Sequence, residues 1–367
     1  MHLKVNELLN KINEIANKDI EQRSKLKTYV NLIYEDIVNN NINLKIEFID
    51  ENITNDYVAC SIDGSKYEID LADITLIIAK AVKIKGRKNN KKEIPSQITE
   101  DLKIIENYYD KNIISNKSIL FMLSLETKLL ETCEDCDVIF IDGPIIDPPT
   151  YYEEDTEING IMSLSRFVLY RSLVIRKLID LNKIIIGIVK NYSHRLLIKE
   201  LMRQGYSVLK NARENYLISN IIYKYRIEKE EISKPIFLGW INWDSLIGEE
   251  LIDDLKGISK AYKEYKKNLD DFSIYSCYYQ YNVTSPISRI DIISKGEPKQ
   301  DALKYIYDWS IPQAKEIILL NKLADNISEI NSQEAKKYAT LFNLLRENYL
   351  DWNDRLAEVM MKRSQTV

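Results

Sequence analysis

The stretch "VIFIDGPIID", residues 138–147, is an apolar run that ends on an acid, a glycine and a proline. Four apolar residues in a row are typical of a buried strand, so Asp142 is predicted at the tip of that strand. The chain repeats the pattern in "YVACSIDGSKYE", residues 57–68, where a mostly apolar run again reaches Ile-Asp-Gly, at Asp63. Two predicted strands therefore each carry an aspartate at the tip.

Two tip aspartates would lie close together if their strands were neighbours. Unpaired anions at short distance raise each other's pKa, and a divalent cation between them would stabilise both. Oxygen ligands select hard cations, which favours Mg²⁺ or Mn²⁺ over zinc. Asp-Gly after an apolar run is also typical of an ordinary turn, and turn chemistry alone explains each motif about equally well. The occurrence of the motif twice favours the metal site.

A third acid supports this interpretation. The segment "SILFMLSLETKLLETC", residues 118–133, is apolar over most of a helical surface, and Glu126 lies in it between Leu125 and Leu129. This pattern predicts that Glu126 points inward, where a buried carboxylate needs a cation or a hydrogen-bonded partner. Glu126 and the two strand aspartates together predict a metal-binding cage.

The order of the other elements predicts one α/β domain with a mixed sheet and helical extensions at both ends. Helical spacing of apolar residues opens the chain over residues 2–40. An antiparallel meander with a tight turn at Asp63-Gly64 is predicted from "LKIEFI", "YVACSI" and "YEIDLADITLIIAKAVKI". Further helices are predicted at 98–132, 163–181, 193–204 and from about 299 onwards, and further strands at "KIIIGIVK", "KPIFLGWI", "IYSCYYQYNV" and "ISRIDII".

Composition restricts the class of protein. The net charge of −5 gives no general attraction for nucleic acid, so such binding needs local basic patches. Residues 83–92, "KIKGRKNNKK", carry six Lys or Arg residues and are predicted as a loop between a strand and a helix, where a solvated loop explains them at least as well as a phosphate contact. The longest apolar runs stop well short of the roughly 18–20 residues of a membrane span. We therefore expect a cytoplasmic protein.

Cysteine and histidine are scarce, with four and two residues respectively. Cys133 and Cys136 form one C-x-x-C motif, which would need two more ligands for a closed zinc site. Cys60 and Cys277 lie far away in the sequence, and nothing in the sequence pairs them with the motif. A zinc or redox role is therefore not predicted. The abundance of Lys, Glu, Ile and Tyr favours a thermophilic source.

The acids and one lysine occur in a recognisable order. Asp63-Gly64-Ser65 follows a predicted strand, Glu126 precedes Asp142-Gly143-Pro144 by sixteen residues, and Lys190 follows in "IIGIVKNYSHRLL". This ordered set resembles the NurA family of archaeal DNA nucleases over roughly residues 50–330. The resemblance implies a ribonuclease H-like mixed sheet flanked by helices. The implied domains are an N-terminal helical extension at 1–50, a nuclease domain at 51–330 and a C-terminal helix at 331–367.

The resemblance also implies a function. Members of the family are dimers that need Mn²⁺ or Mg²⁺ and cleave DNA, in partnership with the hexameric HerA helicase-translocase that processes DNA ends. Asp63, Glu126 and Asp142 would then bind the metal, and Lys190 would lie near the scissile phosphate of single- or double-stranded DNA. The implied reaction is metal-assisted hydrolysis of phosphodiester bonds. The implied process is the processing of DNA ends in double-strand-break repair.

The family's late element, Tyr-Pro-x-Pro-Leu-x-x-Ala-His, has its best counterpart in "YDWSIPQAKEI". Tyr307 matches the tyrosine, whereas Lys315 occupies the place of the histidine, and a protonated lysine cannot ligate a metal. Lys315 could instead hold a phosphate, the alignment could be shifted, or His194 could compensate. The alternative hypothesis is a catalytically weak NurA-like subunit that binds DNA or a HerA-like ATPase without cutting. A third hypothesis is a related enzyme that acts on RNA.

Overall fold

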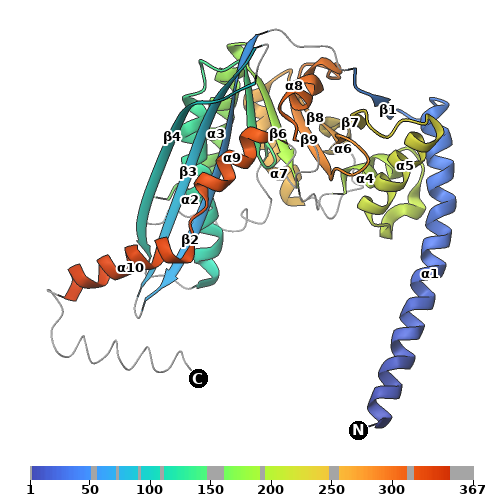
Figure 1. Cartoon of the computed structure of the whole chain (residues 1–367), viewed down its shortest axis with the longest axis horizontal. Helices are drawn as coiled ribbons and strands as arrows, with labels where there is room; N and C mark the ends of the chain where they lie inside the picture. Colours follow the sequence, from blue (N-terminus) through green and yellow to red (C-terminus); the bar gives the residue numbers. More distant parts are fainter. Residues whose placement is uncertain are drawn as a thin grey trace.

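A single nine-stranded mixed sheet organises the chain (Figure 1). The computed structural model describes residues 2–50, 56–71, 74–89, 92–107, 111–146, 161–190, 195–247, 256–311 and 318–347. The strands follow the order β1-β7-β8-β9-β6-β5-β2-β3-β4 across the sheet. Only the central pairs β2–β5 and β5–β6 are parallel, and the other neighbours are antiparallel. The predicted fold class, a mixed sheet flanked by helices with a helix at each end, is confirmed.

The strands and helices are bounded as follows. The strands are β1 (Lys45–Phe48), β2 (Tyr57–Asp70), β3 (Thr75–Lys88), β4 (Lys92–Asn107), β5 (Val138–Asp142), β6 (Ile184–Val189), β7 (Ile236–Asn242), β8 (Ser273–Gln280) and β9 (Ile287–Ser294). The helices are α1 (His2–Val38), α2 (Lys111–Glu131), α3 (Leu164–Asp180), α4 (Leu196–Arg203), the 3₁₀ helix η2 (Ser207–Asn211), α5 (Glu214–Glu228), α6 (Trp243–Ile247), α7 (Lys256–Leu269), α8 (Asp301–Trp309), α9 (Leu319–Ser328) and α10 (Ser332–Glu347). In the part of the chain that the structure describes, no helix is long and apolar enough to cross a bilayer.

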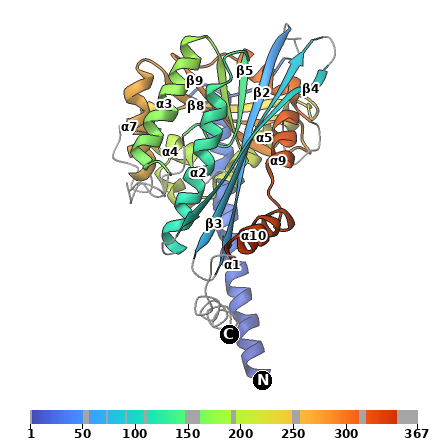
Figure 2. The same cartoon turned by 90° about the vertical axis from the view of Figure 1, so that its left-hand side faces the viewer.

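Helices cover both faces of the sheet, and the alternation of strand side chains divides the core between them. On β2, Cys60 and Ile62 pack into the larger core cluster with α2 and α3, whereas Tyr57 and Ala59 pack into a second cluster with α8 and α9. Figure 2 shows α2 and α9 on opposite sides of β2 and β3. We call these the α2 face and the α9 face of the sheet.

Several sequence predictions need correction around β2, β3 and β4. Asp63 and Gly64 do not form a turn, because β2 continues to Asp70 and pairs with β3 throughout. Residues 98–107 belong to β4, so the predicted helix at 98–132 begins only at Lys111. The strand β1 pairs with β7 and not with β2, so the meander consists of β2, β3 and β4. The continuous pairing of β2 with β3 therefore outweighs the preference of the Asp-Gly dipeptide for a turn.

The basic segment at 83–92 is also not a loop between a strand and a helix. Most of it forms the ends of β3 and β4, which pair with each other. The Nζ of Lys85 lies 2.5 Å from Asp135, Arg87 lies 2.6 Å from Asp56, and Lys88 lies 3.3 Å from Asp308. Paired cations of this kind offer less charge to a phosphate than the sequence indicates.

Phe140 tests how far the sheet depends on β5. Its ring is fully buried in the core cluster of the α9 face, so Phe140→Ala is expected to lower the free energy of unfolding by about 3–5 kcal/mol. The matched control Leu169→Ala removes a side chain that is 52% exposed on α3 and should change it by less than about 0.5 kcal/mol. Denaturant unfolding followed by circular dichroism measures both, and equal effects would contradict this packing.

Candidate metal centre

Asp63 and Asp142 lie side by side because β2 and β5 are parallel neighbours. The register pairs Ile62 with Ile141, so the residue that follows each of them lies at the same level of the sheet. Both aspartates project from the α9 face, in alternation with Ile62 and Ile141 on the α2 face. Asp142 ends β5, as predicted, whereas Asp63 lies in the middle of a long strand. The expected proximity of the two acids is therefore present.

The third acid beside them is Asp325, which the sequence interpretation did not select. One carboxylate oxygen from each of Asp63, Asp142 and Asp325 lies within 4.8 Å of the other two. Asp325 belongs to α9, where it follows Asn321 by one helical turn and precedes Ser328 by another. This surface of α9 packs on β2, and the Ser328 hydroxyl donates to Asp63 Oδ2 at 2.8 Å. The helix is thus fixed with its acid over the two strands.

The two strand aspartates are costly to ionise without a cation. Burial, together with the charges of Asp142 and Asp325, raises the pKa of Asp63 to about 7. Burial also raises the pKa of Asp142, and Lys190 opposes this by placing Nζ 2.7 Å from Asp142 Oδ2. Lys190 therefore lies beside Asp142, and its predicted role at a phosphate stays a prediction.

The donor set fits a hard divalent cation. Three carboxylates that converge within a few ångströms supply oxygen ligands of the type that Mg²⁺ and Mn²⁺ prefer. The Asn321 amide lies close enough to lower the pKa of Asp142, yet its buried Nδ2 makes no hydrogen bond of ordinary geometry with the described residues. A buried donor of this kind suits a ligand oxygen or a water at the site.

Glu126 approaches Asp63 from the other face of the sheet. Glu126 is 5% exposed and so points inward from α2, as predicted. Its Oε2 lies 3.8 Å from Nη1 of the buried Arg171 on α3. Its Oε1 lies against the backbone of Gly64, 2.7 Å from where a Cβ would stand. The described acid cluster therefore contains Asp63, Asp142 and Asp325, with Glu126 behind the strand.

The two glycines that follow the aspartates have different roles. Gly64 leaves the space that the Glu126 carboxylate occupies, so its missing side chain serves close packing of α2. Gly143 has a φ of +131° and nothing within 4 Å of its missing Cβ. Its N–H donates to the Ile188 carbonyl at 2.9 Å. The chain after Asp142 thus turns in a conformation that favours glycine and leaves open space beside the acid.

The late element is only partly described. Tyr307 lies on α8 and stacks on Tyr281, with ring centroids 5.6 Å apart. The next residue, Asp308, accepts a hydrogen bond from Tyr57 at the start of β2, which is about 20 Å along the strand from Asp63. The end of α8 that carries Tyr307 therefore packs at the start of β2, away from the acid cluster. Lys315, predicted in the place of the family's histidine, and His194, predicted as its possible substitute, lie outside the described residues.

The sequence did contain a signal for Asp325. Asp325 is an acid within a largely apolar segment of helical periodicity, residues 319–328, which is the kind of pattern that selected Glu126. An amphipathic segment ending in a buried serine, Ser328, also surrounds it. The sequence interpretation instead selected Tyr307 and Lys315 from the late element.

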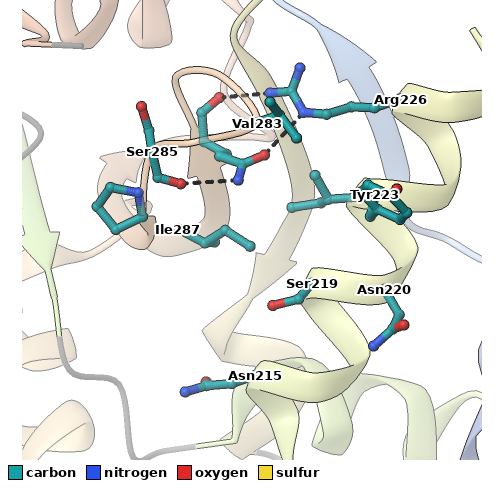
Figure 3. A pocket seen from close by; sticks show the side chains of 11 residues that line it. Asn215, Ser219, Asn220, Tyr223, Arg226, Val283, Ser285 and Ile287 are labelled. Atoms are coloured by element: carbon teal, nitrogen blue, oxygen red, sulfur yellow. Dashed lines mark hydrogen bonds between the residues drawn. The ribbon is translucent and has the colours of Figure 1, made fainter. Parts of the chain in front are cut away.

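A second hollow lies away from these acids. It has a volume of about 550 Å³ and lies between α5 and the connection from β8 to β9 (Figure 3). Arg226 borders it and is held by Gln280, whose Oε1 accepts from the guanidinium Nε at 3.0 Å. None of the three clustered aspartates lines this hollow, so it is not part of the candidate metal centre.

A mixed α/β sheet that presents clustered aspartates at its central parallel strands defines the class of fold, and comparison with known proteins defines the family. The sequence model of the NurA domain family matches residues 57–330 of this chain. The chain therefore belongs to the NurA family. No curated protein sequence matches significantly.

Solved structures agree with this assignment at the level of the fold. The NurA nuclease from Sulfolobus solfataricus is 16% identical, with a TM-score of 0.53, over 92% of this chain and 98% of that one. A second NurA structure is 13% identical, with a TM-score of 0.55, over 90% and 98% of the two chains. A NurA structure with manganese is 11% identical, with a TM-score of 0.51, over the same shares.

The raised pKa of Asp63 predicts how the metal-free protein responds to pH. Between its ordinary value of 3.8 and about 7, the folded chain holds a proton that the unfolded chain has lost. Stability should therefore fall as pH rises through this window, by roughly 4 kcal/mol at most. Asp63→Asn should flatten the dependence, and so should added Mn²⁺. Thermal unfolding in chelator from pH 4 to 8 measures this, with the exposed Asp271→Asn as control; rising stability over the window would contradict it.

Gly64 provides a separate test of the packing behind the acids. A methyl group at this position would meet Glu126 Oε1 at 2.7 Å and Met122 Cγ at 2.9 Å, so Gly64→Ala should cost about 1–3 kcal/mol of stability. Gly296→Ala is the matched control, because nothing lies within 4 Å of its Cβ position. Chemical denaturation of both variants gives the comparison. An unchanged Gly64→Ala protein would show that Glu126 does not lie against β2.

Proposed function

We propose that this chain is a divalent-metal-dependent DNA nuclease that hydrolyses phosphodiester bonds. The observation that carries the proposal is the convergence of Asp63, Asp142 and Asp325 at the central parallel strands, with two of the three acids raised in pKa. Membership of the NurA family supports the same activity, because relatives of similar fold are described as nucleases. The manganese in one relative supports Mn²⁺ or Mg²⁺ as the cofactor.

The residues would share the work as follows. Asp63, Asp142 and Asp325 would hold the metal, which when bound lowers the pKa of a coordinated water and stabilises charge on the reacting phosphate. Ser328 and the rigid strand backbone orient Asp63, so little reorganisation is needed. Lys190 neutralises Asp142 in the absence of a cation. With a cation bound, its ammonium group would be available to a phosphate oxygen of the substrate.

Glu126 stays a proposed member of the same site. Its carboxylate lies against the backbone of Gly64, the residue next to Asp63, and it is buried beside Arg171. Tyr307 is retained as a proposed contributor, and so is Lys315, which lies outside the described residues.

The wider biology is also a proposal from the family. We infer single- and double-stranded DNA as substrates, action at DNA ends in double-strand-break repair, and a HerA-like hexameric ATPase as partner. A homodimer is consistent with α1, whose Leu8, Leu9 and Ile12 are each at least 50% exposed. The domain boundaries at residues 50 and 330, a cytoplasmic location and a thermophilic archaeal source remain predictions.

The second candidate function is a weakly active subunit that binds DNA or the ATPase. The substitution of Lys315 for the family's histidine favours it. Asp325 favours the active enzyme, since it adds a third carboxylate to those of Asp63 and Asp142. Cleavage by the isolated chain separates the two candidates.

The nuclease proposal predicts that the strand acids are indispensable. Asp63→Asn and Asp142→Asn should lower Mn²⁺-dependent cleavage of linear DNA by about 100-fold or more, because each removes a charged ligand. Asp325→Asn should have a similar effect, although the sequence alone did not select it. Cleavage of end-labelled DNA with Mn²⁺ or Mg²⁺, with an RNA substrate alongside, is the measurement.

Asp271→Asn is the control, because its side chain is 81% exposed on the loop before β8 and should leave cleavage unchanged. Folding of every variant is checked by thermal unfolding. Wild-type rates in Asp142→Asn would sink the metal assignment. No cleavage by the wild-type chain with either metal, together with stable binding to DNA, would favour the second candidate.

A further inference from the structure

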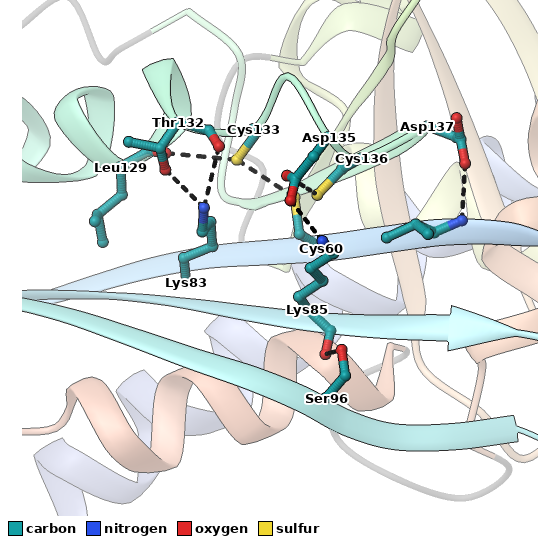
Figure 4. Close-up of polar contacts among 11 residues, drawn as sticks. Cys60, Lys83, Lys85, Ser96, Leu129, Thr132, Cys133, Asp135, Cys136 and Asp137 are labelled. Carbon is teal, nitrogen blue, oxygen red and sulfur yellow. Dashed lines mark hydrogen bonds and ion pairs between the residues drawn. The ribbon is translucent and has the colours of Figure 1, made fainter.

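Three cysteines that are distant in the sequence meet on the α2 face of the sheet. One sulfur from each of Cys60, Cys133 and Cys136 lies within 4.8 Å of the other two, and all three residues are fully buried (Figure 4). The Sγ atoms of Cys60 and Cys133 are 3.4 Å apart. The C-x-x-C motif therefore has a third thiol, supplied by β2, that the sequence did not pair with it.

The geometry points to a site for a thiophilic metal ion, and we propose that Cys60, Cys133 and Cys136 bind Zn²⁺. Sulfur bonds of about 2.3 Å in a tetrahedral site place the sulfur atoms about 3.8 Å apart, so the observed spacing needs only small shifts. Thiolate ligands select soft and borderline cations, unlike the three aspartates on the other face. Cys277 shows the ordinary alternative, a buried cysteine that packs alone in β8.

The surrounding charges suit such a site. Three thiolates and Zn²⁺ leave one net negative charge, and a carboxylate as fourth ligand makes it two. Two lysines of β3 lie on the same face, opposite Ile62 and Cys60 in the register. The buried ammonium group of Lys83 donates to the Thr132 hydroxyl at 2.7 Å and forms no ion pair among the described residues. Hydrogen bonds from Cys136 and Cys60, and then the charge of Lys83, lower the pKa of Cys133. Metal binding would release the thiol protons to solvent.

The three thiols leave the fourth ligand of a tetrahedral ion to be supplied by another group. Asp135 lies next to Cys136, and its Oδ1 is 3.5 Å from the Cys136 Sγ. Lys85 holds the other oxygen at 2.5 Å. We assign Asp135 to the fourth position of the tetrahedral ion, with Lys85 as the group that orients it.

The position gives the metal a structural role. Cys60 precedes Asp63 by three residues on β2, and Cys136 precedes Asp142 by six on the segment that leads into β5. The two segments already pair through Asp137, whose N–H donates to the Val58 carbonyl and whose Oδ2 accepts from the Val58 N–H, each at 2.8 Å. A bound ion would hold together the two strands that carry the aspartates, while remaining on the opposite face.

Metal analysis and spectroscopy of the full chain test the proposal. The chain is purified with reductant, stripped with chelator and titrated with Zn²⁺ or Co²⁺. We expect one tightly bound Zn²⁺, a rise in the thermal midpoint, and a near-ultraviolet sulfur-to-cobalt charge-transfer band with Co²⁺. Asp142→Asn should keep the band, which distinguishes this site from the carboxylates and makes the result independent of nuclease activity.

Cys60→Ser should lose the charge-transfer band and the bound zinc, Asp135→Asn should weaken binding, and the matched control Cys277→Ser should retain both signals. If Cys60→Ser does not fold, the titration of the wild-type chain still decides. Absence of the band in the reduced wild-type chain would overturn the proposal. A disulfide between two of the three cysteines that persists in reductant and excludes the metal, detected by intact-mass analysis, would overturn it as well.

Discussion

The parallel pairing of β2 with β5 is the constraint on which the rest of the structure depends. Its register sets Ile62 beside Ile141, and so brings Asp63 to Asp142. A shift by one residue would move every side chain of one strand to the other face, which would separate the acids and bury one of them among the apolar residues of α2. The buried Ile, Val and Phe residues on both faces of β5 fix that register.

The helix α9 then completes the acid cluster at some cost. It brings Asp325 to two carboxylates that are already difficult to ionise, and burial raises the pKa of both strand aspartates. Ser328 and Lys190 offset part of the cost through hydrogen bonds and charge, and the nearby Asn321 amide also lowers the pKa of Asp142. A cluster of like charges that is largely removed from water is stable when a cation neutralises it, and this connects the packing of α9 to metal chemistry.

The sheet separates two kinds of chemistry by the alternation of its side chains. Odd-numbered residues of β2, which include Asp63, face α9. Even-numbered residues, which include Cys60 and Gly64, face α2. Glu126 belongs to this second face, beside Arg171. Hard oxygen donors and soft sulfur donors thus lie close along the strand but on opposite sides of it.

The sequence by itself determined the mixed α/β class, the strand that ends at Asp142, the inward direction of Glu126 and the family, because apolar periodicity and ordered motifs are local properties. Only the tertiary structure decided that β2 runs through Asp63-Gly64, since fourteen residue pairs with β3 outweigh one turn-forming dipeptide. It also decided that Asp325 joins the acid cluster and that Cys60 joins the cysteine cluster. Asp325 is distant in the sequence from Asp63, and Cys60 is distant from Cys133. Spacing in the sequence carries no information on such distances; the packing of α9 and of the α2–β5 connection against β2 supplies it.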